Sequence, residues 1–385
     1  MICKKPSDLL KQQARINEIP LGWHLTRVKK AVEICNQFRK PINEEERGKI
    51  PGNYPYYGAT SIVDYISTYE QDGRYALIGE DGDHFLKYKD FVQTQIVEGR
   101  ATVNNHAHVI KGTAYCSVDW FYVFFMHRDI THFLSRQGAK RYKLNKGTLE
   151  GLPILLPPLA EQEKIAEILS TWDHAIEQTE RLKANAETHK QALMQQLLTG
   201  KKRFPEFEGE WKEKALGNIV KISKGKALTS KNIVEGDYPV IAGGQTSPYN
   251  HNEYTHENVI TVSASGAYAG FVAFHNYKIW ASDCSVIEES KKVKILYIYY
   301  FLSFQQERIY TYQSGGAQPH IYPRDLAVMK IKLPSPEEQQ KIAAVLNTAD
   351  REIELLAQKL DYLKTEKRAL MQQLLTGKRR VKVDG

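Results

Sequence analysis

The chain has 385 residues, of which 42% are hydrophobic and 25% charged, and its formal net charge is +8. This length and apolar content are typical of a globular protein with two or three domains and exclude a largely disordered chain. The excess of basic residues favours an anionic partner without identifying one. Because the four cysteines show no paired spacing, we predict neither a disulfide framework nor a zinc knuckle, and we expect a reducing cytoplasm.

The first 20 residues predict a short helical segment. Ser7 is a suitable helix N-cap, the residues after it are polar, and Pro20 is expected to stop the helix. The segment has no apolar stretch long enough for a signal peptide, and no run in the chain approaches membrane-spanning length.

Residues 21–157 and 204–334 predict two similar β-rich α/β domains. Short apolar runs at 74–79, 107–111, 258–263 and 284–288 lie between turns rich in glycine, asparagine and serine, as expected of strands. The aromatic runs 120–126 and 296–302 predict buried helices or strands of the two cores. Both segments open on a tryptophan, Trp23 or Trp211, but they diverge strongly further on.

Residues 158–203 and 335–380 predict two long helices, each opened by prolines and acidic residues and closed by Thr-Gly and a basic run. Apolar residues alternate at spacings of four and three, which is the seam of a coiled coil. At 1.5 Å per residue, 40 helical residues span about 60 Å. The apolar seam residues are Ile165, Leu169, Trp172, Ile176, Leu193 and Leu197 in the first helix and Ile342, Leu346, Ile353, Leu356, Leu360, Leu363, Leu370 and Leu374 in the second.

Residues 192–201 recur without change at 369–378, and the match extends upstream at the same shift of 177 residues. A repeat of this length duplicates whole domains. We therefore expect an α+β protein in which the two helices pair as an antiparallel coiled coil with internal pseudo-two-fold symmetry. Packing of each helix on its own domain alone is the alternative. Lys190 and Lys367 occupy equivalent seam positions, where they either set the helix register or extend to its edge.

Three motifs make the chain resemble the specificity subunit of a type I restriction-modification system. They are Leu-Pro-Pro-Leu-Ala-Glu-Gln-Glu-Lys-Ile-Ala at 156–166, its counterpart at 333–343, and the doubled Gln-Gln-Leu-Leu-Thr-Gly-Lys. The resemblance covers nearly the whole chain. It implies that 21–157 and 204–334 are target recognition domains, each reading one half of a bipartite double-stranded DNA sequence. It also implies that the two helices fix the spacer between the halves.

The resemblance further implies the partners of the chain. Modification (methyltransferase) subunits, expected to be two, and restriction subunits dock on it in a cytoplasmic bacterial defence complex. The chain alone is then no enzyme and holds no cofactor or metal. The methyl donor S-adenosylmethionine is expected in the modification subunit.

The expected DNA contacts divide by chemistry. Lysine and arginine bind phosphates, whereas arginine, asparagine, glutamine and histidine also read base edges. The clusters at 140–143 and 318–322 are the strongest candidates because they occupy aligned positions with different side chains. The candidates are Arg47, Lys49, Tyr57, Arg74, Lys87, Lys89, Asn104, Asn105, His106, Lys140, Arg141 and Lys143 in the first domain and Lys224, Lys226, Gln245, Tyr249, Asn250, His251, Tyr268, Gln318, His320, Tyr322 and Arg324 in the second.

A catalytic alternative stays open at this point. Asp283, Glu289 and Lys291 form the carboxylate pair plus lysine that can hold a metal for phosphodiester hydrolysis, so the alternative is a sequence-specific DNA endonuclease. His106 and His108 can face one side of a strand, but with no third ligand nearby they predict no metal site. The sequence shows neither the catalytic tetrad of an adenine methyltransferase nor a glycine-rich fingerprint for its methyl donor.

Overall fold

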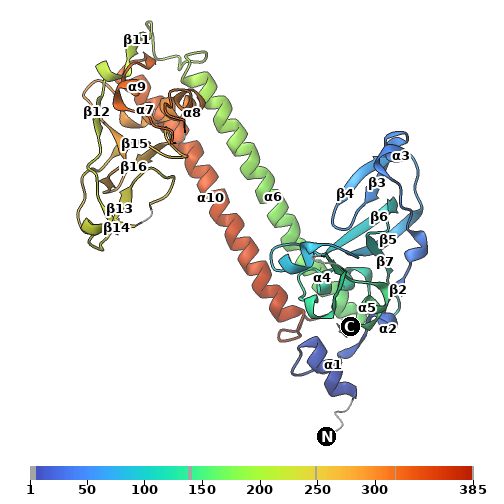
Figure 1. Ribbon diagram of the computed structural model, residues 1–385. Helices are drawn as coiled ribbons and strands as arrows, with labels where there is room; N and C mark the ends of the chain where they lie inside the picture. Colours follow the sequence, from blue (N-terminus) through green and yellow to red (C-terminus); the bar gives the residue numbers. More distant parts are fainter. Residues whose placement is uncertain (1–5, 138–140, 248, 317, 384–385) are drawn as a thin grey trace. The chain divides into compact units, whose positions relative to one another are not determined.

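The computed structural model describes residues 6–137, 141–247, 249–316 and 318–383. The chain divides into two compact units, coloured along the sequence in Figure 1. Unit 1 comprises residues 1–178 and 360–385, and unit 2 comprises 179–359. Each unit therefore contains one α/β segment and half of each long helix. The boundaries predicted at residues 20, 157, 203 and 334 stay predictions.

Unit 1 is built around a six-stranded sheet of order β2-β7-β5-β6-β3-β4, in which β3 and β6 are parallel and the other neighbours antiparallel. Two further strand pairs, β1-β10 and β8-β9, lie outside it. Its elements before the first long helix are α1 (Pro6–Ala14), β1 (His24–Arg27), α2 (Val28–Ala31), β2 (Glu33–Ile34), η1 (Asn36–Phe38), α3 (Glu44–Gly48), β3 (Pro51–Tyr57), β4 (Ile62–Ile66), β5 (Gln71–Gly79), η2 (Asp83–Lys87), β6 (Thr94–Val103), β7 (Ala107–Lys111), α4 (Val118–Phe125), η3 (Thr131–Phe133), β8 (Ser135–Gln137), β9 (Arg141–Lys143), α5 (Lys146–Gly151) and β10 (Pro153–Leu156).

Unit 2 repeats this plan with its sheet divided into β12-β18-β15-β16 and β14-β13-β17, and with the separate pair β11-β19. Its elements between the long helices are β11 (Lys212–Ala215), η4 (Leu216–Asn218), β12 (Lys221–Lys224), η5 (Ser230–Asn232), β13 (Tyr238–Ile241), β14 (Asn250–His251), β15 (Val259–Ser263), β16 (Val272–His275), β17 (Trp280–Ala281), β18 (Cys284–Glu288), α7 (Ile295–Phe304), α8 (Gln306–Tyr310), α9 (Pro323–Ala327) and β19 (Lys330–Leu333).

The aromatic runs form helices that cover one face of each sheet (Figure 1). In unit 1, Trp120, Phe121 and Phe124 of α4 are fully or almost fully buried, and they share a core with Ala76 and Ile78 of β5. In unit 2, α7 packs on β15 and β16 in the same way. Because burial of large aromatic side chains is the largest favourable term in such a core, these helices hold the sheets in place. The apolar runs 74–79, 107–111 and 284–288 lie in β5, β7 and β18, and the run 258–263 contains β15, which begins at Val259.

The two long helices are α6 (Leu159–Leu197) and α10 (Pro336–Leu374). Every predicted seam residue is buried or half-buried, as a seam position should be. Each helix ends where a glycine adopts a left-handed backbone conformation, Gly200 at φ +72° and Gly377 at φ +69°. The amides of Lys202 and Arg379 then donate to the carbonyls of Gln196 and Gln373 at 3.1 and 3.2 Å, which closes the last turn of each helix.

Within each unit the halves of the two helices run antiparallel. The start of α6 (Ile165 and Leu169) shares the unit 1 core with Met371 and Leu374 from the end of α10. The start of α10 shares the unit 2 core with Met194 and Leu197 from the end of α6. The alternative that each helix packs on its own domain alone is therefore wrong.

A buried glutamate connects three segments of each unit. The Glu161 carboxylate accepts hydrogen bonds from Trp23 Nε1 at 3.0 Å and from Arg380 Nε and Nη2 at 2.6 and 2.7 Å. In unit 2, Glu338 accepts from Trp211 Nε1 at 3.1 Å and from Arg203 at 2.9 and 2.8 Å. We call each set of glutamate, tryptophan and arginine a node. Each node ties the opening of an α/β segment to the first turn of one long helix and to the chain just past the end of the other.

The glutamine that follows each glutamate anchors the long helix to the aromatic helix. Gln162 Oε1 accepts from the Ser117 amide at 2.9 Å, and its Nε2 donates to the carbonyls of Tyr115 and Pro157. Gln339 makes the matching bonds to the Lys294 amide and the Pro334 carbonyl, both at 2.9 Å. The Glu-Gln pair of the repeated motif is therefore structural in both units.

The seam lysines pair with aspartates of the opposite helix. Lys367 binds Asp173 within unit 1, and Lys190 binds Asp350 within unit 2. Lys367 is only 8% exposed, so it does not extend to the helix edge as one sequence-based interpretation had it. A buried charge with one correctly placed partner favours a single helix register.

The N-terminal segment differs from its prediction. The helix α1 begins at Pro6 and ends at Ala14, well before Pro20, because Arg15 adopts a left-handed conformation at φ 53°. Arg128 and Arg15 hold this region through the Ala14 carbonyl at 2.7 Å and Asp129 at 2.7 Å. Among the helices of the described residues, none combines the length and apolarity needed to cross a membrane.

We predict that Asp173→Ala lowers the free energy of unfolding by about 1–3 kcal/mol, because it leaves the buried Lys367 ammonium without its partner. Lys367→Leu is expected to be near neutral, since the leucine continues the apolar seam and the partly exposed Asp173 stays hydrated. Urea unfolding of the full chain measures both, with Glu177→Ala on the exposed face of α6 as control. A larger loss for Lys367→Leu than for Asp173→Ala would contradict the assignment.

We also predict an acid-sensitive contribution from Glu161. Burial raises the pKa of this carboxyl, but the hydrogen bonds from Arg380 and Trp23 outweigh burial and hold its pKa below the ordinary value of 4.5. A lowered folded-state pKa gives stability that is present above about pH 4.5 and is lost as the pH falls through the folded-state value. Glu161→Gln should therefore lower stability at neutral pH and flatten its decline below pH 4.5, as measured by urea midpoints from pH 3 to 7. Parallel pH profiles for both proteins would refute this.

Candidate nucleic-acid interface

Strand pairing in unit 1 brings three loops to one edge of the sheet. Gly79 at the end of β5 pairs with Ala107 at the start of β7, so the residues after one strand lie beside those before the other. The segment that includes β9 joins them, because the Leu144 amide donates to the Glu80 carbonyl at 2.7 Å and the Gly82 amide to the Tyr142 carbonyl at 3.2 Å. We call residues 80–82, 104–106 and 141–144 the strand-end edge of unit 1.

Unit 2 builds its strand-end edge from residues 264–266, 281–283 and 318–321. Ser263 pairs with Cys284, the Ile321 amide donates to the Ala264 carbonyl at 3.0 Å, and the Gly266 amide donates to the Pro319 carbonyl at 3.1 Å. These are the bonds of unit 1, with Cys284 and Ile321 each 177 positions after Ala107 and Leu144. The two edges therefore share a backbone and differ in side chains.

The edge of unit 1 carries a network of paired charges. His106 Nδ1 donates to Asp81 at 3.0 Å, while the His106 amide donates to Asn104 Oδ1 at 2.8 Å. Glu80 accepts from Arg39 at 2.6 Å and lies 3.4 Å from Lys143 Nζ. Burial raises the pKa of Glu80, but Arg39, His108 and Lys143 outweigh this and lower it, so the carboxylate is ionised at neutral pH. Glu80 thus balances part of the basic charge of this edge.

Cations and aromatic rings lie beside the strand-end edge of unit 2. Tyr322 has Arg324 at 4.9 Å and Lys224 at 5.7 Å from its ring centroid, and His320 stacks on it at 6.2 Å between ring centroids. Lys226 lies 5.0 Å from the Trp280 ring. Such cation–π pairs hold the charged groups in place, and Arg324 remains largely exposed for an anionic ligand.

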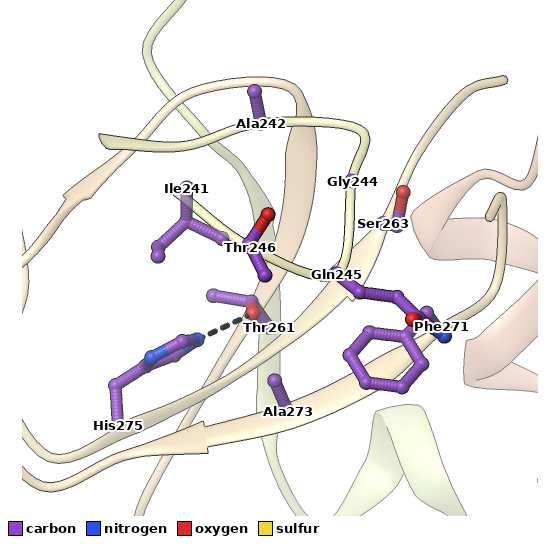
Figure 2. Close-up of a pocket in the computed structure, with 10 residues that line it drawn as sticks. All are labelled: Ile241, Ala242, Gly244, Gln245, Thr246, Thr261, Ser263, Phe271, Ala273 and His275. Atoms are coloured by element: carbon purple, nitrogen blue, oxygen red, sulfur yellow. Dashed lines mark hydrogen bonds between the residues drawn. The ribbon is translucent and has the colours of Figure 1, made fainter. Parts of the chain in front are cut away.

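A small hollow lies next to this edge, under the loop that carries Gln245 and Thr246 (Figure 2). His275 Nε2 bonds Thr261 Oγ1 at 2.8 Å on its floor, and the buried Ser263 hydroxyl has no partner among the described residues. The hollow encloses about 20 Å³, enough for one water molecule but not for a nucleobase. In unit 1, Gly79 takes the position of Ser263, and a Cβ there would lie 2.6 Å from His84 Nε2. The His84 ring therefore occupies the equivalent space.

Several candidates of unit 1 lie away from the edge. Arg74 lies towards the other end of β5 and pairs with Asp119 at 2.6 Å and Glu98 at 2.8 Å. Arg47 pairs with Asp64 at 3.0 Å, and Lys49 with Glu45 at 2.6 Å. Tyr57 ends β3 half-buried, and burial raises its pKa. These residues serve the fold of unit 1 at least as directly as they can serve a ligand.

The remaining predicted DNA-contact residues lie in or near the two edges, or where the structure does not describe their side chains. Asn105 belongs to the strand-end edge, where its carbonyl accepts from Arg39 at 3.1 Å, and Lys87 and Lys89 lie in and after η2. Gln318 lies in the segment that precedes Ile321, and Tyr268 is exposed in the loop after Gly266. Lys140 lies outside the described residues, and of Arg141 the structure describes only the backbone of β9.

His251 was predicted to contact DNA, but the structure gives it a place in the core. It is 5% exposed, and its ring meets the Trp280 ring edge-on at 4.7 Å. The neighbouring Tyr249 and Asn250 are exposed at the β13-β14 hairpin. His251 supports Trp280 and therefore Lys226, so its contribution to the surface is indirect.

The endonuclease alternative is wrong on geometry. Asp283 precedes β18 and Glu289 follows it, so the two carboxylates stand six residues apart along an extended strand, about 20 Å. They cannot share a metal ion. His108, for which the sequence predicted no metal site, is buried and bonded to the Leu144 carbonyl at 2.6 Å and to Asn36. No group of three potential metal ligands occurs among the described residues.

The prediction from sequence missed the acidic and hydroxyl partners at the two edges. Asp81 and Glu80 hold the unit 1 side chains, and Ser265 donates to Asp283 in unit 2. The signal was present, because Asp283 stands 177 positions after His106 in the repeat. The sequence alone also allows Asp283 to be a catalytic acid, because strand pairing across the edge cannot be seen in it.

Comparisons with known proteins agree with this arrangement. The model of the family "Type I restriction modification DNA specificity domain" matches residues 20–188 and again 208–365. A putative type I restriction enzyme specificity subunit of Haemophilus influenzae is 27% identical over 82% of this chain and 84% of its own length. Its counterpart in Methanocaldococcus jannaschii is 25% identical over 96% of this chain and 97% of its own.

The fold is similar to that of a solved type I restriction-modification S subunit from M. genitalium. The TM-score is 0.70 at 16% sequence identity, over 93% of this chain and 96% of the other. The family model matches twice and covers most of the chain, in agreement with the duplicated units. The chain therefore belongs to the type I restriction-modification DNA specificity family and is a specificity subunit.

Proposed function

We propose that each unit reads one half of a bipartite double-stranded DNA target through its strand-end edge. The observation that carries this proposal is the pair of edges with the same backbone bonds and different side chains. Unit 1 presents His106 and Lys143 where unit 2 presents Asp283 and His320. Two unequal half-sites call for different donors and acceptors in the same geometry.

The long helices set the spacer between the half-sites. The reciprocal pairs Lys367–Asp173 and Lys190–Asp350 fix the register of α6 against α10 at two equivalent points. A helix of 39 residues corresponds to about 58 Å, which exceeds the roughly 34–36 Å between half-sites one turn of DNA apart. The length is therefore sufficient for the helices to act as a ruler.

The chain acts by positioning partner subunits and has no catalytic activity of its own. Two modification subunits dock on it, methylate adenine with S-adenosylmethionine bound in their own sites, and are joined by restriction subunits. The support for this is membership in the specificity family and the separation of Asp283 from Glu289. Because its substrate is cellular DNA, the complex works in the cytoplasm.

Exchange of residues 24–153 for the matching segment of another specificity subunit should change one half-site and leave the other half-site and the spacer unchanged. The exchange keeps Trp23 and Glu161, so the node that holds the long helices is retained. Sequencing of bases methylated by the complex with its modification subunits measures the result, and the chain without those subunits should show no methylation. A change in both half-sites would contradict independent reading.

Insertion of one heptad into both long helices, after residues 182 and 359, should lengthen the preferred spacer by about 3 base pairs. Seven residues add about 10.5 Å of helix, against 3.4 Å per base pair, and the paired insertion preserves both lysine–aspartate pairs. Insertion into α6 alone is the control, because it displaces Lys190 from Asp350 and should lower stability instead. An unchanged spacer in the paired variant would exclude the helices as the ruler.

A further inference from the structure

One exposed carboxylate lies in the strand-end edge of unit 2, beside the basic and aromatic residues described above. Asp283 stands directly before β18, and its Oδ2 accepts a hydrogen bond from the Ser265 hydroxyl. Its other oxygen has no partner among the described residues. The Lys224 and Lys226 segment lies alongside, since the amides of Gly225 and Lys226 donate to the carbonyls of Cys284 and Ala281, both at 2.8 Å.

The backbone around Asp283 is held closely from three sides. Its carbonyl accepts from the Ala264 amide at 3.1 Å, and His320 pairs with Ser265 as an isolated bridge. A Cβ on Gly243 would lie 2.7 Å from the Ser265 carbonyl and 3.4 Å from Asp283 Oδ2, so only glycine allows that loop to pass so near. The carboxylate is therefore positioned, although it is exposed and forms no ion pair within the described part of the chain.

A carboxylate among lysines on a DNA-facing surface has a restricted choice of ligand. It is repelled by phosphates and, being only an acceptor, also by the O6 and N7 of guanine and the O4 of thymine. In the major groove a carboxylate accepts best from the N4 amino group of cytosine, which is the only polar group that this base presents there. Adenine also presents an amino group, N6, but its acceptor N7 lies beside it and repels a carboxylate. In the minor groove the one donor is guanine N2. Either groove therefore leads to a C·G pair.

We propose that Asp283, positioned by Ser265, selects a C·G base pair in the half-site read by unit 2. The inference rests on the proposed function of the two edges. At the equivalent place in unit 1, His106 is held by Asp81, so the two half-sites differ in the base read at this position. Asp283 is thus a specificity-determining residue and not a catalytic acid.

The test compares Asp283→Asn with wild type in the complex with modification subunits, on a library of duplexes with both half-sites randomised. The amide can donate as well as accept, so discrimination at one position should relax by about fivefold or more, within the range of base-reading contacts. That position should be a C·G pair in the wild-type target and should lie in the half-site that exchange of residues 24–153 leaves unchanged. Ser265→Ala should relax the same position, and Glu289→Gln, at the other end of β18, should alter none.

Three results would overturn the proposal while leaving the proposed function intact. The first is a wild-type bipartite target whose base preferences Asp283→Asn does not alter. The second is an equal loss across all positions, which would mark a structural or electrostatic role. The third is relaxation at an A·T pair. If the wild-type complex shows no bipartite preference at all, the proposed function fails and this inference fails with it.

Discussion

Each unit depends on the hydrogen bonds that one buried carboxylate accepts, that of Glu161 in unit 1 and that of Glu338 in unit 2. Each stands almost fully buried in the first turn of a long helix, accepts from the tryptophan that opens an α/β segment, and accepts two bonds from an arginine just past the end of the other helix. An ionised buried carboxylate without these donors would destabilise the fold strongly. The node therefore forms only when all three segments are in place, which ties each α/β segment to both helices.

The seam lysines also need a specific partner, and this need fixes the register of the two long helices. A fully apolar seam tolerates sliding by a heptad, because one leucine packs much like the next. Lys367 in a buried position accepts one register, in which Asp173 faces it, and Lys190 applies the same condition with Asp350. Buried ion pairs add little net stability, so their effect is to discriminate between registers. For helices proposed to measure a spacer, a defined register matters more than additional stability.

The features that the sequence predicted well are periodic or local. Alternating spacings of four and three predicted both long helices, and Thr-Gly followed by cations predicted their ends, because these signals lie within a few residues of one another. The site depends on strand pairing instead. Asp81 meets His106 across 25 positions, and Ser265 meets Asp283 across 18, so neither pairing follows from a local pattern. The burial of His251 could not be predicted for the same reason, because it packs against Trp280, which lies on a different strand.

The duplication separates what must stay constant from what can vary. Main-chain hydrogen bonds define the strand-end edges, and they are indifferent to side-chain identity, so position 143 can be lysine and position 320 histidine on the same frame. The nodes at Glu161 and Glu338 use side chains and are therefore identical in both units. Base recognition needs different donors and acceptors at the same positions. The packing of each α/β segment on the long helices needs the same side chains in both units. If each edge reads one half-site as proposed, substitution at one edge changes that half-site and leaves the two long helices and the other edge unaltered.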